Sequence, residues 1–160
     1  MKHLKSYAPV VLGLFTALFA ADCATAGSPA PPAVPASFKV EVAPGSVLPG
    51  GEASVALSLS AADGVKINRY PRIRLTVPAI EGVVAAAEGS VGNDKAPPPG
   101  KMDSNYFKKV DPVELTLSIA PDAPVGNHDI PAKLTYFYCV AASGFCAPKT
   151  VPVEISVRIE

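Results

Sequence analysis

The chain has 160 residues, 14 basic and 14 acidic side chains, and a formal net charge of zero. This length suits one domain with its own hydrophobic core and excludes most multidomain enzymes. The charge balance argues against nucleic acid as a partner, because phosphate binding requires a surplus of Lys and Arg. The 18 prolines argue against a helical bundle, since a proline inside a helix removes a hydrogen bond and clashes with the preceding turn.

The beginning of the chain has the pattern of a cleaved secretory signal peptide. A basic start is followed by an apolar run over residues 7–21 and by the small-residue cleavage site Ala24-Thr25-Ala26. The apolar run is shorter than the roughly 20 residues that a membrane-spanning helix needs. We therefore predict that residues 1–26 are a signal peptide, that the chain is exported to the periplasm, and that no part of it inserts into a membrane after cleavage.

Removal of the signal peptide takes Cys23 with it and leaves two cysteines, Cys139 and Cys146. A lipoprotein anchored through Cys23 is the alternative, although Asp22 is a poor fit to the small uncharged residue expected before such a cysteine. An exported chain with an even number of cysteines occupies a compartment where disulfides form and persist.

The rest of the chain reads as short strands separated by turns. Residues 27–37 are rich in Pro and Ala and predict a semi-rigid leader or a disordered tail. Beyond them, apolar and polar residues alternate with the period of a β-strand. We predict strands over residues 38–42, 54–60, 72–77, 83–88, 113–119, 130–138 and 151–159. About seven strands, with Pro and Gly turn signals between them, predict an all-β, immunoglobulin-like antiparallel β-sandwich over residues 38–160.

The two cysteines flank the connection between the last two predicted strands. Cys139 ends one strand and Cys146 lies just before the next, so a hairpin would bring them within reach of a disulfide. A bridge across so short a loop adds only about 2.5 kcal/mol in the chain-entropy model. The spacing leaves two alternatives open, a structural clamp on an exposed hairpin and a redox-active pair.

Aromatic residues crowd the same segment, among them Tyr136, Tyr138 and Phe145. We predict that Tyr138 and Phe145 offer a flat surface that docks the redox loop of a partner protein. The alternative is that at least two of these aromatic residues belong to the core.

The segment resembles the signature of the amino-terminal periplasmic domain of DsbD, the bacterial thiol:disulfide interchange protein. The similarity rests on Leu134-Thr135-Tyr136 running into Cys139, on Gly144-Phe145-Cys146 with Pro148, and on the exit strand 150–153. A weaker match is the string 63–68 followed by Pro71. Together with the strand over 113–119, the similarity extends over roughly residues 38–158.

The resemblance implies an immunoglobulin-like domain whose cysteine pair relays electrons. In this family a membrane thiol reductase reduces the pair, which then reduces periplasmic thioredoxin-like proteins, including factors of cytochrome c maturation. Cys146 would attack or receive the mixed disulfide, Cys139 would resolve it, and Pro148 would lie at the partner-binding surface. The family also has a cap loop over its disulfide. Asp103, Tyr106 and Phe107 lie in about that region, and the sequence assigns no residue to the cap.

Other chemistry has little support in the sequence. His128 has no nucleophile motif near it, so we interpret it as a turn or strand-edge residue. A metal site of His128, Met102 and a cysteine lacks close ligand spacing. We predict no cofactor and no metal, and a non-catalytic binding or structural sandwich is the alternative to the redox relay.

Overall fold

The computed structural model of the chain describes residues 34–160. The predicted signal peptide, Cys23 and most of the predicted leader lie outside these residues. The described part contains eight strands and one short 3-10 helix: β1 (Ala36–Ala43), β2 (Glu52–Ala61), β3 (Val65–Ile67), β4 (Ile73–Val77), β5 (Ala87–Val91), η1 (Met102–Asn105), β6 (Val113–Ser118), β7 (Gly126–Val140) and β8 (Cys146–Ile159). Between residues 34 and 160, no helix has the length and apolar character needed to cross a membrane.

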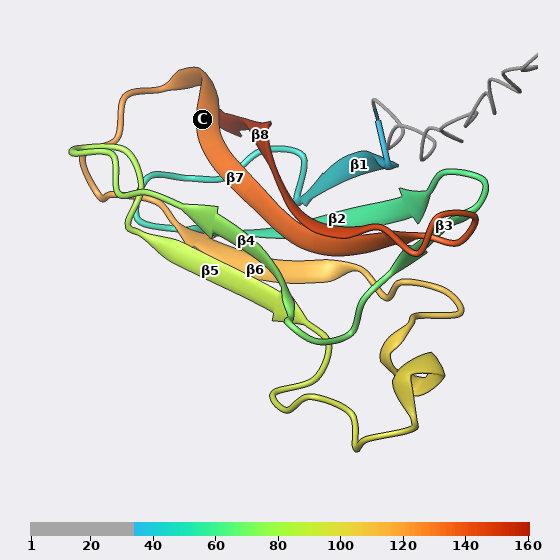
Figure 1. Cartoon of the computed structure of the whole chain (residues 1–160). Coiled ribbons are helices and arrows are strands. Elements are labelled where there is room, and N and C mark those ends of the chain that lie inside the picture. The colour runs from blue at the N-terminus through green and yellow to red at the C-terminus, as the bar shows by residue number, and fades with distance from the viewer. Residues whose placement is uncertain (1–33) are drawn as a thin grey trace, which may run out of the picture.

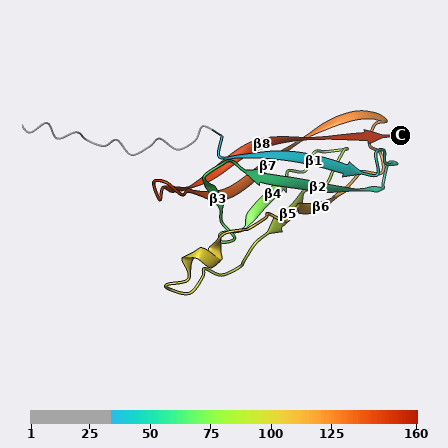
Figure 2. The ribbon, with the colours of Figure 1, turned by 90° about the vertical axis from the view of Figure 1, so that its right-hand side faces the viewer.

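The strands form two antiparallel sheets that face each other (Figures 1 and 2). One sheet has the order β1-β2-β6, and the other has the order β3-β7-β4-β5 with β8 on the second edge of β7. The long strand β7 pairs with β8 along one side, and with β4 and then β3 along the other. The β7–β8 hairpin and the segment that contains η1 extend from the same end of the molecule, opposite the C-terminus (Figure 2).

Strand alternation builds the core between the sheets. Leu57 and Leu117 from the first sheet and Leu75, Ile130 and Ile155 from the second are fully buried in one apolar cluster. The residues between them along each strand point outward and are mostly polar, as expected for sheets with one buried face. The predicted all-β antiparallel sandwich is confirmed, whereas its immunoglobulin-like type stays a prediction.

Most of the predicted strands are present near their predicted positions. The runs over 38–42, 54–60, 72–77, 113–119, 130–138 and 151–159 correspond to β1, β2, β4, β6, β7 and β8. β1 begins at Ala36, so the last two residues of the predicted leader belong to this strand. The difference arises because Ala36 and Ser37 pair with Ala61 and Ser60 of β2, which a Pro/Ala-rich composition does not reveal.

The strand predicted over 83–88 is wrong in position. Gly82 adopts a positive φ of 67°, and the Val83 N–H donates a hydrogen bond to the Ile80 carbonyl, so the chain turns here. The strand β5 starts only at Ala87, where pairing with Val77 begins. A run of alanines carries no alternation that could locate the start of the strand.

The sheets come into very close contact where β5 meets β6. A Cβ atom added at Gly89 of β5 would collide with the carbonyl oxygen of Glu114 on β6. Gly89 therefore allows two backbones to approach at a distance that no side chain permits. This contact closes one side of the sandwich.

We predict that Gly89→Ala destabilises the fold, because the strand must move away from Glu114. The expected loss is about 1–3 kcal/mol in the free energy of unfolding, measured by urea denaturation. Gly45→Ala is the matched control, since an added Cβ there meets no atom within 4 Å. Equal stability of the two variants would contradict the close approach of β5 and β6.

Candidate functional site

The two cysteines form a disulfide at the end of the β7–β8 hairpin. Cys139 of β7 lies directly opposite Cys146 of β8 in the antiparallel register, and their Cα atoms are 4.1 Å apart. The pairing that the hairpin connection predicts is therefore present.

Backbone hydrogen bonds close the hairpin without help from the disulfide. The Val140 N–H donates to the Phe145 carbonyl at 2.8 Å, and the Gly144 N–H donates to the Val140 carbonyl at 2.9 Å. Gly144 supplies the positive φ of 68° that this turn requires. Because Val140 and Phe145 are a hydrogen-bonded pair, the adjacent cysteines occupy a non-hydrogen-bonded pair, where opposite side chains lie closest.

The two halves of the disulfide differ in exposure. Cys139 has only 5% of its surface exposed, because β7 is flanked by β8 on one side and by β3 on the other. Cys146 is exposed at the start of β8, which is an edge strand. A partner molecule therefore reaches the sulfur of Cys146 more readily than that of Cys139.

Each sulfur has an oxygen atom close by. Oδ1 of Asn68 lies 3.6 Å from Sγ of Cys139, and the carbonyl oxygen of Gly144 lies 3.6 Å from Sγ of Cys146. In the disulfide neither sulfur carries a hydrogen. After reduction, each thiol would have an acceptor within reach of a weak S–H hydrogen bond.

A short strand and a loop flank the disulfide on the outer face of the sheet. Lys66 of β3 pairs in register with Cys139, and its Nζ lies 4.8 Å from the centre of the Tyr106 ring. The same Nζ is 3.9 Å from Oδ1 of Asp103, and Tyr106 forms an isolated bridge with Asn68. Asp103 and Tyr106 thus belong to a segment that lies one strand away from Cys139.

The predicted partner-binding residues lie on different faces of the hairpin. Pro148 shares the exposed face of β8 with Cys146, two residues away. Phe145 is 41% exposed and packs against Tyr138, with ring centres 6.3 Å apart. Tyr138 is buried in the core, so the ring of Phe145 packs on a core residue. Of the three predicted partner-binding residues, two are therefore at the surface: Pro148 beside the disulfide and Phe145 on the opposite face.

The buried Tyr136 adds no charge to this region. Burial, and to a smaller extent the neighbouring Tyr138, raises the pKa of Tyr136, so its phenol stays protonated at neutral pH.

Lys66 and Asn68 are site residues that sequence reasoning did not identify. Both belong to the string 63–68, which carries a turn signal and a similarity to the DsbD domain, but no residue roles. β3 has only three residues, too few to show an alternating pattern. The position of these side chains beside Cys139 depends on a pairing between segments about 70 residues apart.

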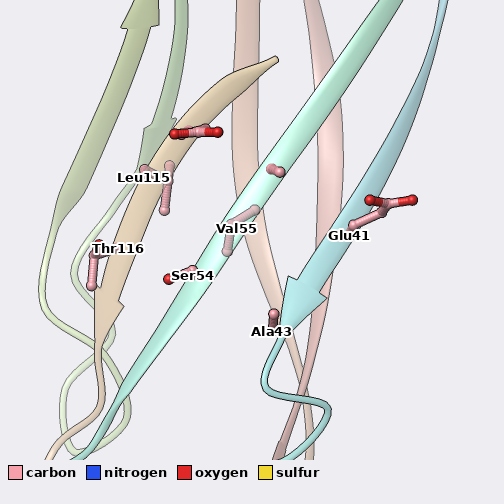
Figure 3. A pocket seen from close by; sticks show the side chains of 8 residues that line it. Glu41, Ala43, Ser54, Val55, Leu115 and Thr116 are labelled. Atoms are coloured by element: carbon pink, nitrogen blue, oxygen red, sulfur yellow. The ribbon is translucent and has the colours of Figure 1, made fainter.

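A surface hollow and His128 lie away from the cysteine pair. The surface hollow in Figure 3 lies on the three-stranded sheet, and its lining includes Glu41, Glu114 and small side chains such as Ser54. His128 lies in the strand β7. Its Nε2 is 2.7 Å from the Pro124 carbonyl oxygen. Within residues 34–160, no three His, Cys, Asp or Glu side chains gather as a metal site would require.

No protein-family profile matches the chain, and no curated protein matches it significantly.

We predict that the reduced protein is alkylated faster at Cys146 than at Cys139, because only Cys146 is exposed. The expected difference is about tenfold or more in the rate of modification by iodoacetamide, followed by mass spectrometry of each peptide. In urea the two rates should become similar, which serves as the control for intrinsic reactivity. Equal rates in the folded protein would contradict the shielding of Cys139.

Proposed function

We propose that this protein is an exported thiol–disulfide exchange domain that acts through Cys139 and Cys146. The observation that carries the proposal is the asymmetry of the disulfide. An exposed sulfur on an edge strand is bonded to a shielded sulfur on a central strand. An exchange pair needs one thiol that meets the partner and a second that resolves the intermediate.

The exchange proceeds in two displacements. The Cys146 thiolate attacks one sulfur of a partner disulfide, which forms a mixed disulfide and releases one partner thiolate. The Cys139 thiolate then attacks Sγ of Cys146, which restores the internal disulfide and releases the second partner thiolate. The partner gains two electrons and the Cys139–Cys146 pair loses two. Asn68 can accept the S–H hydrogen bond of Cys139 until that thiol is deprotonated.

The partners we propose follow from the resemblance to the amino-terminal domain of DsbD. A membrane thiol reductase returns two electrons to the pair, and periplasmic thioredoxin-like proteins receive them. The fold is then of the immunoglobulin-like type, and the exported location follows from the predicted signal peptide. No cofactor takes part, because thiolate exchange needs only the sulfur atoms of the two proteins.

The exposed face around Cys146 provides the surface for docking. Pro148 lies beside Cys146 on the same face, and its ring presents an apolar surface without a backbone N–H. Phe145 contacts a partner only if that partner wraps around the tip of the hairpin. We therefore assign the principal contact to Pro148 and a peripheral one to Phe145.

A structural clamp is the second candidate function, favoured by the position of the cysteines directly opposite each other in a regular hairpin. Two observations favour exchange instead. The hairpin is already closed by hydrogen bonds of Val140 and Gly144. The loop between the cysteines is also short, with a sequence separation of 7, so the bridge restricts the unfolded chain by only about 2.5 kcal/mol.

We predict that Cys139→Ala accumulates a mixed disulfide with a partner, because Cys146 can still attack but the Cys139 thiol that completes the exchange is missing. The variant is incubated with a purified, oxidised periplasmic thioredoxin-like protein, and free thiols are then blocked with N-ethylmaleimide so that the released partner thiol cannot reverse the step. The adduct is measured on a non-reducing gel and by mass spectrometry. Cys146→Ala should form about tenfold less adduct, since the remaining thiol is shielded.

The double variant with both cysteines replaced by alanine is the control for non-covalent association. Absence of an adduct with Cys139→Ala, or equal adduct from both single variants, would refute the exchange function. The reduction potential gives an independent readout, because a clamp is expected to be more reducing than about −300 mV.

We also predict that reduction leaves the domain folded. The expected loss in the free energy of unfolding is no more than about 2.5 kcal/mol, because backbone hydrogen bonds hold the hairpin. Urea denaturation of the oxidised protein and of the reduced protein measures this difference. A domain that unfolds when the disulfide is reduced would support the clamp.

A further inference from the structure

The free edge of β1 differs from the edges of β6 and β8. β6 is approached closely by β5, as the contact between Gly89 and Glu114 shows. β8 has Pro148 and Pro152 at positions whose backbone nitrogens point away from β7, so its edge lacks donors there. β1 pairs with β2 alone and contains no proline between Ala36 and Ala43.

The hydrogen-bond pattern identifies the unpaired groups on this edge. The Ala62 N–H donates to the Pro35 carbonyl, which makes this a hydrogen-bonded pair of the β1–β2 ladder. Because such pairs alternate, the backbone groups of Phe38, Val40 and Val42 point away from β2. Within residues 34–160 no other backbone group bonds to them.

The side chains of β1 are also less covered than those of the other core strands. Phe38 points toward the interior side of the sheet, opposite Leu59, yet 41% of its surface is exposed. Val40 and Val42 on the same side are only partly buried. Figure 3 shows β1 as the outermost strand of its sheet, beside the hollow that Glu41 and Ala43 border. An additional strand along this edge would bury apolar surface and satisfy backbone groups together.

The charges on β1 are self-complementary. Lys39 and Glu41 lie on the outer face, with 75% and 64% of their side-chain surfaces exposed. Consider two antiparallel copies of β1 with Val40 opposite Val40 of the second copy. Lys39 then faces Glu41 of the second copy, and symmetry repeats the pair. Opposite charges in such non-hydrogen-bonded pairs are stabilising.

Neighbouring registers are disfavoured. Because the even-numbered residues carry the outward backbone groups, β1 can shift only in steps of two residues. A step in one direction places Lys39 opposite Lys39 of the second copy, and a step in the other places Glu41 opposite Glu41. Like charges directly opposite each other are destabilising. The charge pattern therefore selects one register.

We propose that β1 is a self-association edge that pairs antiparallel with β1 of a second copy of this chain. Phe38 exchanges hydrogen bonds with Val42 of the second copy, and Val40 with Val40 of the second copy. The two three-stranded sheets become one continuous sheet with a twofold axis at Val40. The Lys39–Glu41 ion pair of each copy, at 2.8 Å on the surface, is lost, so two pairs within the chains are exchanged for two pairs between the copies at little cost.

The experiment measures the mass of the purified protein by sedimentation equilibrium over a range of concentrations, with the disulfide intact. We expect a concentration-dependent doubling of mass. Amide hydrogen exchange should show protection of Phe38, Val40 and Val42 that rises with concentration, because these amides are free only in the monomer. Lys39 and Glu41 amides, already bonded to β2, should not change.

Two kinds of variant locate the interface. Val40→Pro removes an outward donor without touching the β1–β2 hydrogen bonds and should abolish the dimer. Lys39→Glu creates two repulsive pairs and should weaken association about tenfold. The double variant with Lys39→Glu and Glu41→Lys restores opposite charges and should restore association. Lys133→Glu, an equal change of charge on an exposed residue of β7, is the matched control.

Circular dichroism and urea denaturation establish that each variant is folded. A monomer at all concentrations would overturn the proposal, whether the edge stays free or is occupied by the residues that precede it. A dimer that persists in Val40→Pro would overturn it as well. So would a double variant, Lys39→Glu with Glu41→Lys, that associates no better than Lys39→Glu alone.

Discussion

In the β7–β8 ladder every residue of β8, from Cys146 to Ile159, lies opposite a residue of β7. The disulfide, the core and the exposed edge all depend on this one register. A slip by one residue would turn Ile155 and Val157 outward and Glu154 and Ser156 inward, so burial of the apolar residues fixes the register. The same register places Cys146 opposite Cys139. The cysteines are therefore brought together by the hydrophobic pattern of strands that extend far beyond the hairpin.

Strand alternation explains how much of the structure the sequence reveals. Residues 113–119 and 151–159 alternate strictly. β6 lies where the pattern predicts it, and β8 contains the predicted range but begins earlier, at Cys146. β3 is too short to show a period, and the start of β5 follows a turn at Gly82 and a run of alanines. The cysteine pair is local and could be predicted from the hairpin. Its neighbour Asn68 comes from a distant segment and could not, because a contact at long sequence separation leaves no local pattern.

The aromatic residues around the cysteines show why sequence proximity is a poor guide to a surface. Tyr138, Phe145 and Pro148 are close in sequence, but successive residues of a strand point to opposite faces. Tyr138 enters the core, Phe145 packs on it, and Pro148 lies beside Cys146. Only Pro148 shares a face with the exposed sulfur. The surface beside the disulfide is otherwise formed by β3 and the Tyr106 segment, whose Lys66 and Asp103 give it both signs of charge.

The sheet edges follow from the same alternation. On β8, prolines occupy outward positions, where they remove donors without breaking the ladder to β7. This leaves the exposed sulfur of Cys146 on an edge that does not favour the addition of a strand, so the exchange partner that we propose would be held by side-chain contacts and a transient covalent bond. β1 has the opposite character, with free donors and self-complementary charges. The two surfaces share no residue, and each suits one of the proposed contacts: reversible exchange at the hairpin and strand pairing at β1.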